Sequence, residues 1–238
     1  MTSTVISLKK SVWQRLGARL RRFRLPRDLA GETGTDSVAF SIAFIALCAK
    51  LAKADGLVTR DEVIMFRQIF EIPASEERAV ARVYDLCRQS TTGFEAYARQ
   101  IDRSLGVDDI EARCDVLDGL ALIAMADGEF HPDEEAFLRS VADCLGVPDA
   151  HLAGILARHV PDRQDPFLVL QLSPDAEIED LRQARRALAK LHHPDRMTAR
   201  GIPAEMRAIA QHRMAAINAA YDEALRLIGQ RQAPDLQP

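Results

Sequence analysis

An internal repeat limits the possible folds of this chain more than any other feature of its sequence. Residues 51–66 read LAKADGLVTRDEVIMF, and residues 123–137 read IAMADGEFHPDEEAF. Each copy has an apolar helical pattern, the triplet Ala-Asp-Gly, one further residue, an apolar residue and then an acidic pair. The glycine can take the positive φ that ends a helix, and the acids suit the first turn of the next helix. We therefore predict two helix–loop–helix corners that face each other.

Composition favours the same class of fold. Aromatic residues make up only 5% of the chain, alanine is abundant, and valine and isoleucine rarely alternate with polar residues. These frequencies favour helices over sheets. The uncharged run at residues 37–49 (SVAFSIAFIALCA) is short for a bilayer span and is followed at once by charged residues, so we expect a buried core helix. The expected fold class is all-α, with a helical bundle over residues 37–156.

Charge is distributed unevenly along the chain. The formal net charge is −4, whereas residues 1–27 hold eight lysines and arginines and no acid, which leaves about −12 for the rest. An acidic body with one basic arm is unlike a nucleic-acid-binding domain, so we expect no nucleic-acid partner. The arm carries apolar residues at helical spacing: Val12, Trp13, Leu16, Leu20 and Phe23. It can contact an anionic membrane surface, or it can fold back on the acidic bundle or stay solvated.

Metal binding and thiol chemistry have weak support in the sequence. The four cysteines form no CxxC pair and lie in helical apolar patterns, which predicts buried, reduced thiols: Cys48, Cys87, Cys114 and Cys144. The acids of the repeat are candidate cation ligands, chiefly Asp55, Glu62, Asp127 and Glu134. They lack the alternating spacing of a calcium loop, and helix capping explains the aspartates. We expect neither a metal nor another cofactor.

The C-terminal third predicts a helical hairpin. After a linker at residues 157–164, Asp165 and Pro166 suit the start of a short helix. A second, amphipathic helix follows, with a basic exposed face: Arg182, Arg185, Arg186 and Lys190. The triplet His-Pro-Asp at residues 193–195 ends it, because a proline biases the preceding residue away from helical angles. A loop at residues 196–203 leads to a third helix, which can pair with the second and place this triplet at one tip of the hairpin.

This C-terminal pattern resembles a known family. The segment DPFLVLQLSPDAEIEDLRQARRALAKLHHPDR, followed by INAAYDEAL, resembles a J domain over its whole length. The insertion ARGIPAEM and the doublet His192-His193 resemble the DjlA type of J protein. The Ala-Asp-Gly repeat resembles the TerB domain, which precedes the J domain in that type. Together the two resemblances cover residues 37–229, flanked by an arm at residues 1–36 and a tail at residues 230–238 that we expect to be disordered.

The resemblance implies a co-chaperone that is not itself an enzyme. A J domain docks on the nucleotide-binding domain of a DnaK-type chaperone and triggers ATP hydrolysis there. By matching positions, His193, Pro194 and Asp195 would form the trigger. The basic second helix would steer the domain toward an acidic patch on the chaperone, through Arg182, Arg185, Arg186 and Lys190. The implied location is the cytoplasm, with peripheral contact at the inner membrane if the arm binds lipid.

Two positions depart from the family pattern, and two other interpretations stay open. Arg185 stands where a tyrosine is usual, and Gln171 stands where a glycine usually ends the first helix. A Gly/Phe-rich region and a zinc-binding client domain are absent from the sequence, as in minimal, specialised J proteins.

The protein could instead be a stress- or envelope-sensing scaffold of the TerB type that uses its J domain only for docking. Metal binding by His192, His193 and Asp195 would strain a short loop.

Overall fold

The computed structural model describes residues 37–54, 60–70, 72, 77–105, 109–203 and 206–232. Helix is the only regular secondary structure in these residues, which confirms the all-α class. The basic arm and the first Ala-Asp-Gly corner (residues 55–59) lie outside them. In chain order the helices are α2 (Ser37–Ala54), α3 (Arg60–Phe70), α4 (Glu77–Cys87), α5 (Phe94–Ser104), α6 (Ile110–Ala124), α7 (Pro132–Leu145), α8 (Asp149–His159), η2 (Pro161–Arg163), α9 (Pro166–Val169), α10 (Ile178–Leu191), α11 (Pro194–Ala199) and α12 (Arg207–Gln232).

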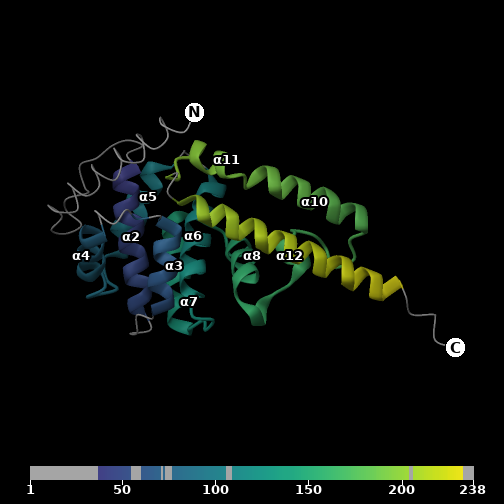
Figure 1. The fold of residues 1–238 in the computed structure, drawn as a ribbon, viewed down its shortest axis with the longest axis horizontal. Coiled ribbons are helices and arrows are strands. Elements are labelled where there is room, and N and C mark those ends of the chain that lie inside the picture. The colour runs from purple at the N-terminus through teal and green to yellow at the C-terminus, as the bar shows by residue number, and fades with distance from the viewer. Residues whose placement is uncertain are drawn as a thin grey trace.

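Helix α2 is the centre of the bundle. Its side chains from Phe40 to Ala49 are buried, as expected for a helix that is apolar on all sides. It packs against α4, α5, α6 and α7 (Figure 1). The ring of Phe44 lies 5.4 Å, centroid to centroid, from that of Phe70 in α3. The expected core helix is confirmed, and no helix in the described part of the chain is long and apolar enough to cross a bilayer.

The second Ala-Asp-Gly corner has the geometry that the repeat predicts. Gly128 has φ 88°, and the Asp127 carboxylate accepts the backbone N–H of the residue two positions later, at 3.1 Å. Phe130 packs against the bundle core. Glu134, in the first turn of α7, accepts the backbone N–H of His131 at 3.0 Å. These contacts end α6 and start α7 within a few residues of each other. The sequence alone could therefore predict the corner.

The C-terminal hairpin shares a helix with the bundle. Helices α10 and α12 pair antiparallel, and α12 continues from the bundle along the whole hairpin (Figure 1). Near its start, Ile209 and Ala210 belong to the bundle core, whereas Ile217 and Ala224 belong to a second core with α9 and α10. The stretch expected as a linker holds the last residues of α8 and the short helix η2, and α12 runs to Gln232. The two halves therefore meet over a packed interface.

The end of α9 contains one of the two departures from the family pattern, Gln171. Gln171 has φ 57°, in the left-handed region that favours glycine. Its N–H donates to the carbonyl of Leu168 at 3.1 Å, and the N–H of Leu172 donates to that of Phe167 at 2.8 Å. This is the helix-ending pattern that normally carries glycine at the Gln171 position.

A close approach of two helices predicts an effect of Gly119→Ala. A Cβ on Gly119 in α6 would lie 2.6 Å from Cδ1 of Ile209 in α12 and 3.0 Å from Cζ of Phe44. Because all three sites are buried, we expect the free energy of unfolding in urea to fall by about 1–3 kcal/mol. The matched control is Gly154→Ala in α8, where a Cβ meets no atom within 4 Å. That change should stabilise the protein by about 0.5–1 kcal/mol, and equal effects of both substitutions would contradict the packing.

Candidate functional site

The His-Pro-Asp triplet forms an exposed turn at the tip of the hairpin, where α10 ends and α11 begins. His193 precedes α11 with φ −62° and ψ 137°, and its Nδ1 accepts the backbone N–H of Asp195 at 3.3 Å. Pro194 is the first residue of α11, where a missing N–H is tolerated. The side chains of His193 and Asp195 are 59% and 93% exposed. The triplet thus presents an imidazole and a carboxylate to solvent from a capped helical turn.

The segment after the triplet differs from what the sequence predicted. Residues 196–203 were expected to form a loop, whereas α11 continues to Ala199. The N-cap at His193 and the proline that follows it start this helix locally. Met197 then places its side chain in the bundle core, so the segment is held by tertiary packing.

The basic residues of α10 all lie on its exposed surface. Arg182 and Arg186 both reach Glu179, at 3.3 and 3.2 Å. Such surface pairs are weak, so both guanidinium groups can exchange partners at little cost. The guanidinium carbon of Arg185 lies 4.6 Å from the ring centroid of Tyr221 in α12. Lys190 is exposed in the last turn, beside the His-Pro-Asp turn.

The structure describes three of the four candidate cation ligands. Glu134 is buried and takes part in the capping of α7, Glu62 is buried in α3, and Asp127 closes the second corner. Asp55 lies outside the described residues. In the part of the chain that the structure describes, no three His, Cys, Asp or Glu side chains are grouped to hold a metal ion.

The four cysteine thiols are free. Cys48, Cys87 and Cys114 are buried as predicted, whereas Cys144 is only half-buried. Burial raises the pKa of all four thiols, that of Cys114 to about 12. A high pKa keeps a thiol protonated and unreactive at neutral pH, so these side chains behave as apolar packing groups.

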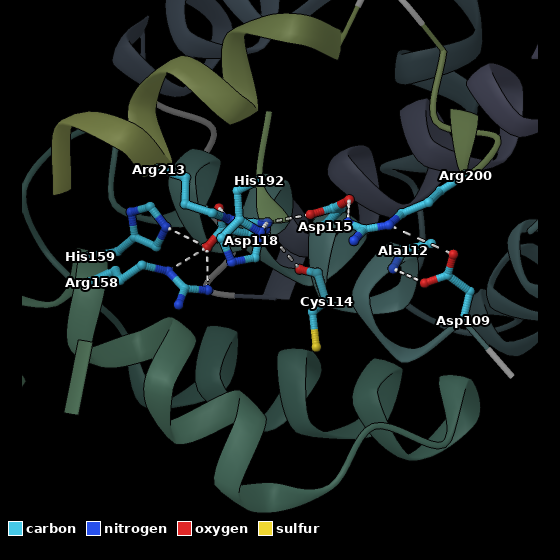
Figure 2. A network of polar contacts seen from close by, with 10 residues as sticks. All are labelled: Asp109, Ala112, Cys114, Asp115, Asp118, Arg158, His159, His192, Arg200 and Arg213. Atoms are coloured by element: carbon cyan, nitrogen blue, oxygen red, sulfur yellow. Dashed lines mark hydrogen bonds and ion pairs between the residues drawn. The ribbon is translucent and has the colours of Figure 1, made fainter. Parts of the chain in front are cut away.

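A buried polar cluster, which the sequence interpretation missed, joins the bundle to the hairpin. Arg213 of α12 is completely buried. Its Nε donates to Oδ2 of Asp118 at 2.9 Å, and its Nη1 donates to Oδ1 of Asp115, both in α6. The same Nη1 lies 2.7 Å from Nδ1 of His192, the residue just before the His-Pro-Asp turn. Figure 2 shows these side chains converging from α6, α12 and the end of α10.

Further polar side chains complete this cluster (Figure 2). The guanidinium of Arg158 and Nε2 of His159, both from α8, lie 2.8 and 3.1 Å from Oδ1 of Asp118. Nη1 of Arg200 lies 3.7 Å from Oδ2 of Asp115, beyond hydrogen-bond distance. We call this set of residues the interdomain cluster: Asp115, Asp118, Arg158, His159, His192, Arg200 and Arg213.

The pKa values of the cluster follow from burial and neighbouring charge. Burial by itself would raise the pKa of Asp118, but Arg158, Arg213 and His159 outweigh it and hold that pKa well below its usual range. Burial raises the pKa of Asp115, and Arg213 counteracts only part of the shift. Burial and the positive charge of Arg213 lower the pKa of His192 to about 3. His192 is therefore neutral at pH 7.

One signal in the sequence could have revealed the cluster. Asp115 and Asp118 are three positions apart in the mostly apolar, buried stretch of α6 at residues 114–124, and so share one face of it. Arg213 likewise falls between Ala210 and Ile217 on the inward face of α12. Acids and an arginine on buried faces call for partners, because an unpaired buried charge is costly. The sequence could not show that the two aspartates pair with this arginine, because these residues are far apart in the chain.

Comparisons with known proteins match both parts of the chain. The family model described as tellurite resistance protein TerB matches residues 41–157. The co-chaperone protein DjlA of Aliivibrio fischeri is 26% identical over 81% of this chain and 80% of its own length. The DjlA protein of Vibrio parahaemolyticus is 25% identical over 77% and 75%, and that of Shewanella oneidensis is 32% identical over 42% and 43%. No solved structure matches.

Proposed function

We propose that the chain, a co-chaperone of the DjlA type that matches the TerB family over residues 41–157, stimulates ATP hydrolysis by a DnaK-type chaperone. The observation that carries this proposal is the exposed His-Pro-Asp turn at the tip of the hairpin. It lies at the end of a helix whose outer surface is basic. We assign residues 165–229 to the J domain and residues 37–156 to a regulatory or recruiting bundle.

The proposed role requires no bond-making group on this chain, because hydrolysis takes place in the chaperone. Asp195 is nearly fully exposed and can accept hydrogen bonds from an arginine of the partner. His193 holds the turn through its bond to the N–H of Asp195 and still leaves its ring accessible. The arginines of α10 supply positive charge that guides an acidic surface into place.

A single-turnover assay tests the proposal. Purified DnaK-type chaperone loaded with labelled ATP is mixed with increasing amounts of the full chain, and the rate of phosphate release is measured. We expect the rate to rise with concentration and to saturate. Binding to the chaperone without any rise in the rate would refute the proposal and favour the scaffold that uses its J domain only for docking.

Reversing charge on α10 should weaken docking more than it changes the fold. In the variant Arg182→Glu/Lys190→Glu both substituted side chains are exposed, so melting should change little. We expect association with the chaperone to slow by roughly tenfold at low salt, and wild-type association to slow as salt rises. Surface plasmon resonance at several salt concentrations measures both. Association of the wild type that is independent of salt would contradict charge steering.

The placement of the protein in the cell stays a prediction. We propose the cytoplasm, with residues 1–27 as the segment that would bring the protein to an anionic membrane surface. Sedimentation of the full chain with anionic vesicles, compared with neutral ones, tests this contact. Equal sedimentation with both kinds of vesicle would contradict it.

A further inference from the structure

We propose that His192 and Arg213 are positioning residues that tie the His-Pro-Asp turn to the TerB bundle, so that the bundle sets the geometry of the docking turn. This inference rests on the proposed function, which it extends to residues that need not touch the chaperone. In this inference the interdomain cluster contributes to docking on the chaperone. In a hairpin without the bundle, the His-Pro-Asp turn would have to dock without that support.

The first tether precedes the turn. His192 ends α10, its backbone N–H donates to the carbonyl of Leu188 at 2.9 Å, and its side chain is only 4% exposed. A guanidinium can only donate, so Nδ1 of His192 is the acceptor from Arg213, and the ring is neutral. Because Arg213 is held by Asp115 and Asp118 of α6, the position of His192 is fixed relative to the bundle. One peptide bond separates this anchored residue from His193.

The second tether follows the turn. Met197 and Ile202 are each 2% exposed and belong to the bundle core. Between them, Arg200 lies 3.8 Å from Asp109 at the start of α6. Gly201 has φ 97°, and a Cβ there would lie 2.9 Å from the backbone carbonyl of Ser104. The chain thus passes tightly against α5 and α6 immediately after the exposed turn.

The two tethers leave a short exposed segment between two buried anchors. His193 and Asp195 keep their side chains in solvent, while the residues on both sides pack on the bundle. A turn that is ordered before binding loses less conformational entropy when it docks, which favours association and correct geometry. Misplacement of such a group by about 1 Å can reduce a rate by about 100-fold. A structural change in the bundle near α6 would therefore reach the turn directly.

His192 offers a clean test because its loss leaves the rest of the cluster in place. Without the imidazole, Arg213 still has both carboxylates, and Asp118 still has Arg158. In His192→Leu the ring is replaced by an apolar group and the tether is lost. In the matched variant His192→Asn the side-chain oxygen can accept the Arg213 hydrogen bond near the position of Nδ1. The two full-length variants therefore differ mainly in the tether.

Two measurements separate positioning from stability. In the single-turnover assay we expect His192→Leu to lower the maximal stimulated rate roughly tenfold, and His192→Asn to retain most of it. Hydrogen exchange of the backbone amides of residues 195–201 should be faster in the leucine variant and close to wild type in the asparagine variant. Amides in α2 and α7 should exchange as in the wild type in both, which controls for general loss of stability.

The outcomes distinguish this inference from the proposed function. If the wild type stimulates hydrolysis and His192→Leu stimulates equally well, the positioning role is wrong. If the wild type does not stimulate, the proposed function fails, and hydrogen exchange alone decides whether the tether orders the turn. Unchanged exchange of residues 195–201 in His192→Leu would overturn the inference in either case.

Discussion

We expect the substitution His193→Gln to return ATP hydrolysis by a DnaK-type chaperone to its unstimulated rate. The imidazole is 59% exposed, and among the described residues it accepts a hydrogen bond from the N–H of Asp195. Its loss therefore removes a surface group and a local cap, which costs at most about 1 kcal/mol of stability. The measurements are the single-turnover rate, with circular dichroism and thermal melting to show that the fold is retained.

The matched control for this prediction is His151→Gln. His151 is an exposed histidine of α8 that lines one cleft with His192 but is not part of the triplet. The same chemical change there should leave both the stimulated rate and the melting temperature unchanged. If His193→Gln stimulated as well as the wild type, the assignment of the turn as the trigger would be wrong, whatever the outcome at His151.

The largest effect on stability is expected for Arg213→Met. Among the described residues, this change leaves Asp115 with the more distant Arg200, while Asp118 retains Arg158 and His159. Breaking a buried ion pair by removing one partner costs about 3–5 kcal/mol, because the other charge stays buried. We expect a loss of that size in the free energy of unfolding, measured in urea at pH 7.

Two further variants identify the source of that loss. Arg226→Met removes a guanidinium from the same helix, where it pairs with the exposed Glu223, and should cost less than about 1 kcal/mol. Adding Asp115→Asn to Arg213→Met removes the stranded charge and should restore part of the stability. A double variant that is as unstable as the sum of the two single variants would show that the two residues are not coupled.

The sequence alone determined the elements whose signals are local. The apolar run became α2, and Asp165 and Pro166 start α9 as expected, because capping and apolar periodicity act within a few residues. The prediction of the second Ala-Asp-Gly corner was confirmed for the same reason. The basic surface of α10 and the position of the His-Pro-Asp turn after it were also readable.

The tertiary structure alone decided how the two halves join. Arg213 pairs with Asp118 and Asp115, which are 95 and 98 positions away in the chain, and no local pattern encodes a partner at that distance. The apolar residues of α12 divide between two cores: its first turns complete the bundle core, and its later turns complete the hairpin core. A periodic pattern of apolar residues indicates that one face of a helix is buried. Because the hydrophobic effect is non-directional, the pattern does not identify the element against which that face packs. Only the folded chain brings α6, α8, α10 and α12 together around one arginine.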